Sequence, residues 1–225
     1  MTLLQFRDFS VDYASSEGIV PAVRGVTLDV AAGETLGIAG ESGCGKTSLA
    51  SAVLRLLPET AQVRGEIRLD GVDILTMKWG TLRAVRWSQA AIVFQGALHA
   101  LNPVQRIGDQ IAEPIRLHQT VPEKQINARV GELLSQVGLP ASRAKSYPHQ
   151  LSGGQRQRVM IAMALACKPA LIIADEPTTA LDVMVQAQVL DLLTGLVRDA
   201  SAGPDGGMGM ILISHDLGVL GTTCD

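Results

Sequence analysis

The stretch Thr35–Thr47 reads "TLGIAGESGCGKT" and joins a short apolar run to a loop rich in glycine. The first five residues have the length and character of a buried strand, and the next segment, Ser48–Leu57, has the pattern of a helix. The loop "GESGCGKT", Gly40–Thr47, matches G-x-x-x-x-G-K-[ST] in the strand, loop and helix context that this motif requires. The stretch therefore predicts a phosphate-binding loop.

Such a loop binds phosphate because its glycines let backbone N–H groups surround the anion, and because the helix N-terminus adds positive potential. The side chain of Lys46 is expected to reach the β- and γ-phosphates, and the hydroxyl of Thr47 is expected to bind Mg²⁺. The candidate nucleotide-binding residues of this segment are Gly40, Glu41, Ser42, Gly43, Cys44, Gly45, Lys46, Thr47 and Ser48.

Short apolar runs alternate with helical patterns along the second half of the chain. The runs "ALIIAD" (170–175) and "MILIS" (210–214) predict buried strands, and a glycine-rich loop at 200–209 precedes the second. An amphipathic helix is predicted between them from the spacing of Val185, Val189, Leu192, Leu193 and Leu196. This alternation favours a parallel sheet covered on both faces, with its active site at the carboxyl ends of the strands.

The first third of the chain has a different pattern. Residues 3–13, 22–30 and 66–75 alternate apolar and polar side chains, and "LDG" at 69–71 divides the last run, so antiparallel strands with a hairpin are predicted. In the middle of the chain, a helix is predicted from the helical spacing of Ile126, Val130, Leu133, Leu134 and Val137. It is expected to end at Gly138, because glycine is a natural left-handed C-cap residue.

These patterns predict an α/β fold with a P-loop NTPase core. The expected parts are a mostly parallel sheet, an N-terminal antiparallel β subdomain and an inserted helical subdomain at roughly 100–165. We expect them to form one domain over residues 1–225. No internal repeat or coiled-coil heptad is visible.

Composition narrows the class of protein. The 225 residues are 47% hydrophobic and 3% aromatic, which suits a compact α/β domain with an aliphatic core. The net charge of −3 argues mildly against nucleic-acid binding, because neutralising phosphates needs a basic face. Cys44, Cys167 and Cys224 are widely spaced, so we expect reduced thiols rather than disulfides or a metal site.

Neither a membrane span nor a signal peptide is expected. The most apolar run, Val159–Cys167, is followed by Lys168 and Pro169 and is well short of the roughly 20 residues that a span needs. The start, "MTLLQFRDFSVDY", has acidic residues and no basic flank before an apolar core. A cytoplasmic location is therefore expected.

Two neighbouring carboxylates, Asp175 and Glu176, end the predicted strand at 170–175, where a parallel sheet presents its active edge. An aspartate there can hold Mg²⁺, usually through water, and an adjacent carboxylate can orient and deprotonate the water that attacks a γ-phosphate. Taken alone, such a pair is more often only a polar end to a strand. The phosphate loop upstream favours the catalytic interpretation.

Five motifs in a fixed order give a more specific indication: "GESGCGKT", "LSGGQ", "LIIADE", "TTALD" and "SHD". With them the chain resembles the nucleotide-binding subunits of ABC transporters over essentially its whole length. The resemblance implies the ABC ATPase fold, ATP and Mg²⁺ as ligands, and ATP hydrolysis coupled to transport. It also implies a second ABC ATPase subunit, identical or different, that pairs head to tail with this one.

In that pairing, the "LSGGQ" signature of one subunit closes over ATP held by the phosphate loop of the other. The signature residues that would approach the partner's nucleotide are Ser152, Gly153, Gly154 and Gln155. A bare glycine backbone at a helix N-terminus suits such an approach. Asp182 in "TTALD" would reach across the same dimer, and its position also suits a helix N-cap.

The resemblance assigns roles to three further residues, each unremarkable in isolation. Gln95, after "AAIVF", corresponds to the Q-loop glutamine, which would contact Mg²⁺ and its water and couple the site to the membrane subunit. His215 corresponds to the switch histidine, which would contact the γ-phosphate and position the water. Tyr13 lies where the adenine-stacking aromatic is expected. The expected catalytic residues are Glu176, His215 and Gln95, and the expected metal ligands are Thr47, Gln95 and Asp175.

Two segments, "LNPVQRIGDQIAEP" (101–114) and 147–193, resemble the dipeptide and oligopeptide importer branch of this family. Close relatives of that branch carry nickel, opines or glycosides. The segment "QGALHALNP" departs from the usual "Q-D-P…S-L-N-P" form, so the cargo stays open. The implied partners are two transmembrane permease subunits and, indirectly, an extracytoplasmic substrate-binding protein, with this subunit on the inner face of the membrane. The chain ends ten residues after His215, and a truncated C-terminus is expected.

Two other classes of function stay open. One is a soluble ABC-type ATPase of DNA repair, chromosome structure or translation, although no inserted coiled coil, zinc module or second ATPase domain is visible. The other is a binding or regulatory module that holds ATP without turning it over. Measured ATPase activity would separate the second from the transport ATPase.

Overall fold

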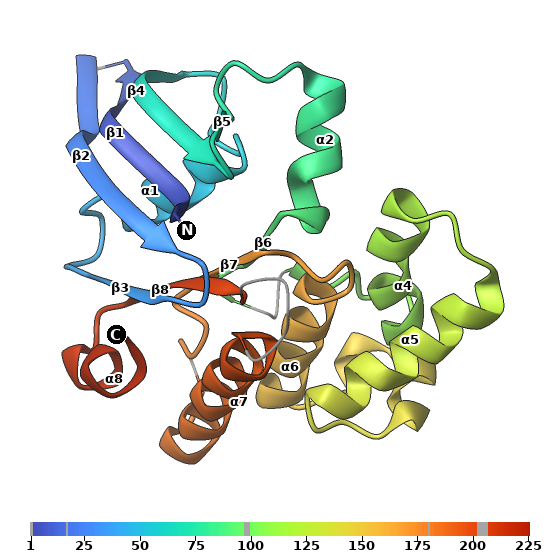
Figure 1. Ribbon diagram of the computed structural model, residues 1–225. Coiled ribbons are helices and arrows are strands. Elements are labelled where there is room, and N and C mark those ends of the chain that lie inside the picture. The colour runs from blue at the N-terminus through green and yellow to red at the C-terminus, as the bar shows by residue number, and fades with distance from the viewer. Residues whose placement is uncertain (1, 17, 97–99, 180, 202–206) are drawn as a thin grey trace.

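A computed structural model describes residues 2–16, 18–96, 100–179, 181–201 and 207–225. Within these residues the strands form two four-stranded sheets, one antiparallel in the order β2-β1-β4-β5 and one parallel in the order β3-β8-β7-β6. Figure 1 shows the antiparallel sheet above the parallel one, helix α1 between them, and helices α6, α7 and α8 below. None of the described helices is long and apolar enough to cross a membrane.

The antiparallel sheet confirms the predicted N-terminal strands and hairpin. Its strands are β1 (Thr2–Ser15), β2 (Gly18–Ala31), β4 (Ala61–Leu69) and β5 (Val72–Asp73). Strands β4 and β5 are joined by Asp70 and Gly71, with φ of 49° and 76°. Positive φ at both positions is typical of a type I′ turn, which Asp-Gly favours.

The parallel sheet contains the three predicted strands, β3 (Thr35–Ala39), β7 (Leu171–Asp175) and β8 (Gly209–Ser214), together with β6 (Ala90–Val93). All five residues of β7 are buried. Leu171 and Ile173 belong to the core shared with α1 and the antiparallel sheet, whereas Ile172 and Ala174 belong to the core shared with the helices on the other face. Burial on both faces explains why these strands are continuously apolar.

Helix α1 (Lys46–Val53) differs from the predicted helix at 48–57 at both ends. It begins two residues earlier because its N-cap is Gly45, with φ of 97°. It ends earlier because Arg55 adopts a left-handed conformation, with φ of 48°, which an α-helix does not continue through. Two short helices were not predicted: α2 (Trp79–Ser88) and α8 (Leu217–Thr223).

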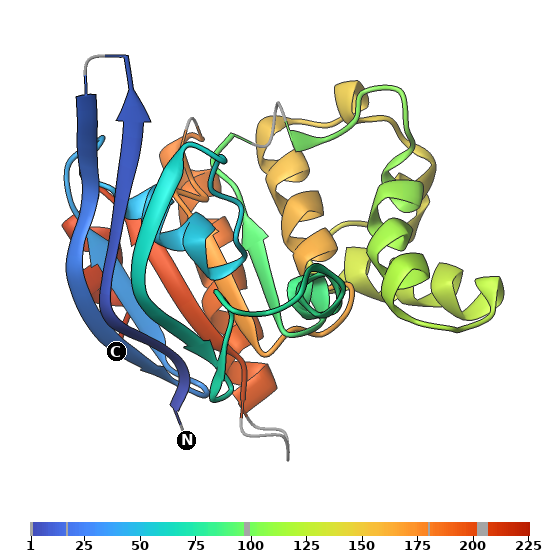
Figure 2. The ribbon, with the colours of Figure 1, turned by 90° about the horizontal axis from the view of Figure 1, so that it is seen from above.

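The middle of the chain is helical, with α4 (Ile107–His118), α5 (Glu123–Gln136), the 3₁₀ turns η1 (Ala141–Lys145) and η2 (Pro148–Gln150), and α6 (Gly153–Ala164). The predicted end of α5 is confirmed, because Gly138 has φ of 69°. Figure 2 shows α4 and α5 projecting away from the two sheets. The predicted insertion at roughly 100–165 contains these helices, and its treatment as a separate subdomain stays a prediction.

Helix α7 (Val183–Ser201) contains the predicted amphipathic pattern. The glycine-rich loop predicted at 200–209 lies largely outside the described residues.

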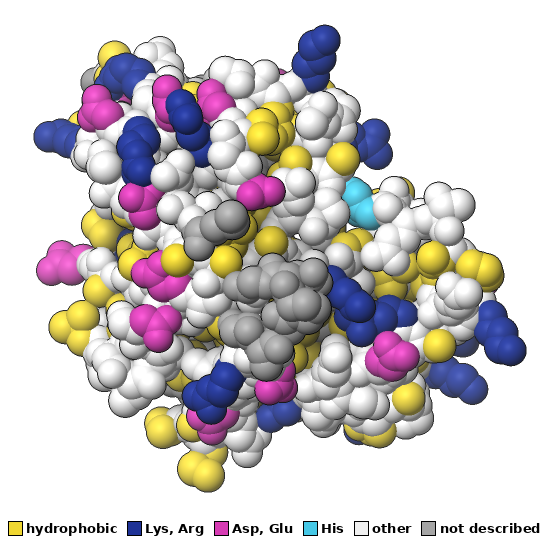
Figure 3. Space-filling view, viewed as in Figure 1, with side chains coloured by type: hydrophobic (Ala, Val, Ile, Leu, Met, Phe, Trp, Pro, Cys, Tyr) yellow, Lys and Arg dark blue, Asp and Glu magenta, His cyan; other side chains and the backbone are white. Residues whose placement is uncertain are grey.

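The outer face of the antiparallel sheet carries charges of both signs. Figure 3 shows Lys or Arg side chains intermingled with Asp or Glu side chains over this region, at the upper left. Several of them form ion pairs, such as Arg7 with Asp29 and Arg68 with Glu66, at N–O distances of 2.7 Å and 2.8 Å. These pairs are exposed, so each contributes little to stability.

Candidate active site

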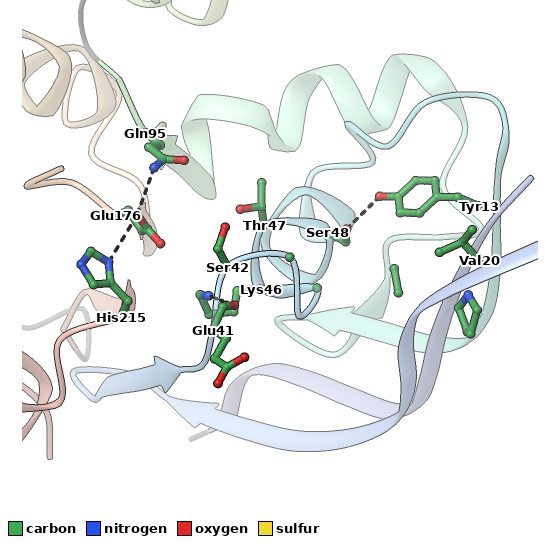
Figure 4. A pocket seen from close by; sticks show the side chains of 14 residues that line it. Tyr13, Val20, Glu41, Ser42, Lys46, Thr47, Ser48, Gln95, Glu176 and His215 are labelled. Carbon is green, nitrogen blue, oxygen red and sulfur yellow. Dashed lines mark hydrogen bonds and ion pairs between the residues drawn. The ribbon is translucent and has the colours of Figure 1, made fainter. Parts of the chain in front are cut away.

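A pocket of about 680 Å³ lies at the carboxyl edge of the parallel sheet and gathers most of the predicted site residues (Figure 4). The predicted residues that line it are Tyr13, Glu41, Ser42, Gly43, Gly45, Lys46, Thr47, Ser48, Gln95, Glu176 and His215. A volume of this size is within the usual range for small-molecule sites.

The sheet topology explains why residues far apart in sequence meet here. Parallel pairing sets Ala39 beside Ser214 and Asp175 beside Ile213, so β3, β7 and β8 end at one edge. The phosphate loop follows β3, Glu176 follows β7, and His215 follows β8. Gln95 lies two residues beyond the end of β6, on the far side of β7. The site is therefore a consequence of strand order.

The phosphate loop already has a compact conformation. The ammonium of Lys46 is buried and donates hydrogen bonds to the backbone carbonyls of Gly40 and Glu41, at 2.7 Å and 2.8 Å. Its Nζ also lies 3.8 Å from Sγ of the exposed Cys44. Gly40 and Cys44 belong to this loop but are not among the residues that line the pocket. Lys46 must exchange these carbonyls for phosphate oxygens to reach a nucleotide.

The other end of the pocket is apolar. The Tyr13 hydroxyl donates a hydrogen bond to Oγ of Ser48 at 2.9 Å, which ties the aromatic residue to the first turn of α1. Val20, Pro21 and Ala22 of β2 complete this end, and the sequence analysis did not identify them. Only the packing of β2 against the phosphate loop reveals them, because an alternating strand carries no chemical signal of its own.

Polar groups converge on the carboxylate of Glu176. Its Oε2 accepts hydrogen bonds from Nε2 of Gln95 at 3.0 Å and from Oγ1 of Thr179 at 2.9 Å. Nδ1 of His215 lies 3.6 Å from the same oxygen, and Figure 4 shows Gln95 and His215 approaching it from opposite sides. Thr179 belongs to the "TTALD" motif, but only Asp182 of that motif was among the predicted site residues.

Asp175 lies beneath this cluster and is 1% exposed. Burial raises the pKa of its carboxyl, and the negative charge of Glu176 acts in the same direction, while a hydrogen bond from Thr47 and the charge of Lys46 oppose the rise. Its Oδ1 is buried and has no hydrogen-bond partner within the described residues. A buried, unsatisfied carboxylate oxygen beside a threonine hydroxyl is a donor set that suits Mg²⁺.

No group of three or more His, Cys, Asp and Glu side chains forms a metal site within the part of the chain that the structure describes. The predicted magnesium ligands include a hydroxyl and an amide, so they do not form such a group. The fit to Mg²⁺ therefore depends on Thr47, Asp175 and Gln95.

The signature residues and Asp182 do not line this pocket. Ser152 is the N-cap of α6, where its Oγ accepts a hydrogen bond from the Gln155 N–H at 3.3 Å, while the Ser152 N–H donates to Oε1 of Gln155 at 3.1 Å. Asp182 precedes α7 and accepts from the Val185 N–H at 3.0 Å, which confirms its predicted position as a helix cap. The chain therefore carries a second glycine-rich helix start, away from its own pocket.

The two glycines of this helix start have different surroundings. A Cβ added to Gly154 would lie 2.3 Å from Cγ1 of Val185, so α7 packs directly against that backbone. A Cβ added to Gly153 would meet only Cδ2 of Leu181, at an ordinary 3.5 Å. Packing within the chain therefore requires the glycine at 154 but not the glycine at 153.

Comparison with known proteins agrees with this geometry. The family model described as "ABC transporter" matches residues 23–179, more than half of the chain. The chain is 46% identical over 226 residues to "Oligopeptide transport ATP-binding protein OppD" of Mycobacterium tuberculosis, covering 99% of this chain and 36% of that protein. It is 48% identical over 222 residues to "Peptidoglycan transport ATP-binding protein YejF" of Agrobacterium fabrum, covering 97% of this chain and 40% of that protein.

Solved structures are similar over nearly the whole chain. The dimeric structure of MJ0796, described as a bacterial ABC transporter cassette, has a TM-score of 0.83 and 29% identity, covering 96% of this chain and 90% of that one. Another dimeric structure of that protein, in a post-hydrolysis state with ADP and Pi, has a TM-score of 0.82 and 28% identity over the same shares. The chain spans well under half the length of the two peptide-related proteins above. It belongs to the ABC transporter family.

Proposed function

We propose that this chain binds and hydrolyses ATP with Mg²⁺ and supplies the energy for an ABC importer of dipeptides or oligopeptides. The observation that carries the ATPase part is the convergence of Lys46, Glu176, Gln95 and His215 on one pocket. The names of the similar proteins support the transport part.

The roles of the residues follow from their positions. Tyr13 offers an aromatic face to the adenine at the apolar end of the pocket. The N–H groups of the phosphate loop and the ammonium of Lys46 bind the phosphates. Glu176 accepts the proton of the attacking water, and Gln95 and His215 hold the groups around the γ-phosphate in position.

Two residues that line the pocket, together with Asp175, which does not line it, offer ligands for a metal ion. Thr47, Asp175 and Gln95 would hold Mg²⁺, and Asp175 has a buried oxygen without a partner among the described residues. Mg²⁺ bound with the nucleotide would neutralise charge on the phosphates.

We infer a composite site in which a second ABC subunit completes the pocket. Gly153 supports this inference, because no close contact with the described residues requires a glycine there. The dimeric form of the similar cassette structures supports it as well. Ser152, Gly154, Gln155 and Asp182 would accompany Gly153 at the partner's nucleotide.

A second cavity offers a place for permease subunits. It holds about 310 Å³ and is mostly apolar, with Leu54, Leu56, Trp87, Phe94, Leu101, Met160 and Met163 among the residues that line it. Phe94 is 39% exposed and directly precedes Gln95, whose amide reaches Glu176. A partner seated on Phe94 would therefore be coupled mechanically to the catalytic carboxylate. This arrangement supports a peripheral position on the inner face of the membrane, beside two permease subunits.

The first experiment tests the ATPase site. Glu176→Gln is expected to bind Mg·ATP without hydrolysing it and to accumulate as a dimer in light scattering, because the nucleotide that joins the subunits persists. The matched control is Glu176→Gln combined with Lys46→Ala, which should stay monomeric because it cannot hold the phosphates. A monomer from the single variant in Mg·ATP, or equal dimer from both variants, would contradict the composite site.

The second experiment tests the transport role. Tagged protein isolated from its native membranes in mild detergent should carry two multi-span permease chains, and a peptide-binding lipoprotein recovered with them would support the cargo. Phe94→Asp is expected to lose the permeases while keeping nucleotide binding. Val72→Asp, at an apolar and exposed position of β5, should keep both. Recovery of soluble partners alone would favour the soluble ABC ATPase class, and a nickel-, opine- or glycoside-binding partner would correct the cargo.

A further inference from the structure

The carboxylate of Glu176 is held asymmetrically. Every described hydrogen bond to this carboxylate reaches Oε2, from Gln95 at 3.0 Å and from Thr179 at 2.9 Å, and His215 faces the same oxygen at 3.6 Å. No hydrogen bond to Oε1 is found among the residues that the structure describes. One oxygen is therefore anchored and the other is available.

The donors differ in origin. Gln95 and His215 follow other strands, β6 and β8, so their contacts depend on how those strands and loops lie. Thr179 is three residues from Glu176 in the same turn, and its N–H also donates to the Glu176 carbonyl at 3.2 Å. The turn thus brings the Thr179 hydroxyl within hydrogen-bond distance of the Glu176 side chain, at the start of the same turn.

The backbone of Glu176 supports the same geometry. Glu176 has φ of 44°, a left-handed conformation that is unfavourable for a residue with a side chain. Its N–H donates to the carbonyl of Ile213 at 3.0 Å, which extends the pairing of β7 with β8 by one residue. Strain of this kind persists only where surrounding contacts hold it, and the Thr179 contacts are among those that do.

We propose that Thr179 is a positioning residue for ATP hydrolysis. Its hydroxyl donates to Oε2 and fixes the carboxylate plane, so that Oε1 faces the water that attacks the γ-phosphate. In that step the water oxygen bonds to the γ-phosphorus and the bond from phosphorus to the bridging oxygen breaks, leaving its electron pair on ADP. The proton of the water passes to Oε1. The inference rests on the proposed function, in which Glu176 is the base.

The chain allows a clean test because Thr179 is exposed. Thr179→Val removes the hydroxyl and keeps the shape, whereas Thr179→Ser keeps the hydroxyl and removes the methyl group. Neither change should disturb the core. Thr194→Val is a control at another threonine, whose hydroxyl bonds only carbonyls of its own helix, at Leu190 and Asp191.

Steady-state ATPase kinetics of the complete protein carry the main readout. T179V is expected to lower kcat roughly tenfold with KM within about twofold, because a misaligned base affects the chemical step rather than nucleotide binding. T179S should stay within about twofold of wild type in both constants, and T194V should match wild type. In the Glu176→Gln background, T179V should cause no further loss, because Thr179 acts through the carboxylate.

Four results would overturn the inference. They are an unchanged kcat in T179V, an equal loss in T179S and T179V, a rise in KM as the main effect, and loss of the Mg·ATP dimer when T179V is placed on Glu176→Gln. The last two would assign the hydroxyl to the nucleotide or to the partner subunit. Wild-type protein without ATPase activity would overturn the proposed function and this inference together, whereas active wild type with an unaffected T179V overturns this inference alone.

Discussion

Helices α1 and α6 both begin at a glycine-rich loop, but their first turns are completed in opposite ways. Helix α1 starts at Gly45 without a side-chain cap and without an acidic residue in its first turn. Helix α6 starts at Ser152, which forms reciprocal hydrogen bonds with Gln155. No side chain caps the first backbone N–H groups of α1, so they can bind an anion. In α6, by contrast, the Gln155 N–H already donates to the Ser152 side chain.

The glycines of the two loops also serve different purposes. Gly43 and Gly45 have φ of 82° and 97°, so the phosphate loop needs glycine for its backbone conformation. Gly153 and Gly154 have no such requirement, and Gly154 is needed for the approach of α7. Glycine in a helix start can therefore be required by the backbone conformation in one case and by the close approach of another helix in the other.

The largest effect is expected from Gly45→Ala. An added Cβ would lie 2.1 Å from the carbonyl oxygen of Ala22, and φ of 97° is unfavourable for alanine. We expect a loss of about 3 kcal/mol, or roughly 10 °C in Tm, together with loss of nucleotide binding. Thermal unfolding and binding of an ATP analogue would measure both.

Gly43→Ala is the matched control for this substitution. Gly43 also has positive φ, but no atom lies within 4 Å of its added Cβ. It should therefore lose only the conformational part, about 1 kcal/mol. Equal losses in the two variants would mean that contact with β2 is not what requires glycine at position 45.

The next effect separates the two signature glycines. Gly154→Ala should destabilise the nucleotide-free protein by about 1–3 kcal/mol, because Val185 must move away from the new methyl group. Gly153→Ala should be neutral or stabilising by up to about 1 kcal/mol, because alanine favours a helix and its Cβ would meet only Leu181, at an ordinary contact distance. On the composite-site proposal, Gly153→Ala should nevertheless weaken the Mg·ATP dimer of Glu176→Gln.

Thermal unfolding and light scattering on the same samples would compare these variants. If Gly153→Ala left the Mg·ATP dimer of Glu176→Gln undiminished, the proposed role of Gly153 at the partner's nucleotide would be contradicted. The two glycines would then differ only in packing.

The smallest effect concerns charge beside the phosphate loop. Burial holds the pKa of Asp175 above its ordinary value, so ionising this carboxyl costs stability. The cost is absent below about pH 4, develops as pH rises through the raised pKa, and is fully present above it. Asp175→Asn should therefore raise the Tm of the nucleotide-free protein at pH 7, by roughly 2–4 °C for about 1 kcal/mol, and should not do so at pH 4.

Asp191→Asn, at an exposed position of α7, is the control and should leave Tm unchanged at both pH values. A gain for Asp175→Asn that is equal at pH 4 and pH 7 would show that its origin is not the charge. Asp175→Asn should also lose ATP turnover that depends on Mg²⁺, if Asp175 is a ligand as proposed.

Local pattern was enough to predict most of the elements. Strands β7 and β8 were predicted because residues buried on both faces of a sheet are almost continuously apolar, and the short apolar run of β3 gave the same pattern although that strand is only partly buried. Helix α5 was predicted from its spacing and from Gly138. Helices α2 and α8 were missed, because α2 buries only Leu82 and Val85 and α8 buries only Leu220, which leaves a weak periodic signal.

The sequence by itself determined the family of this protein and its candidate site residues, because the phosphate-loop motif, the Asp175–Glu176 pair and the signature are each contiguous and need residues of one type at fixed spacing. Only the tertiary structure decided which groups act on one another. The order β3-β8-β7-β6 places Gln95 and His215 on either side of Glu176, and β2 lays Val20 beside Tyr13. The turn after β7 brings the Thr179 hydroxyl to the carboxylate of Glu176, and α7 packs against Gly154 but not against Gly153. The contacts of Glu176 with Gln95 and His215, and of Gly154 with Val185, join residues far apart along the chain, so strand order and packing define them.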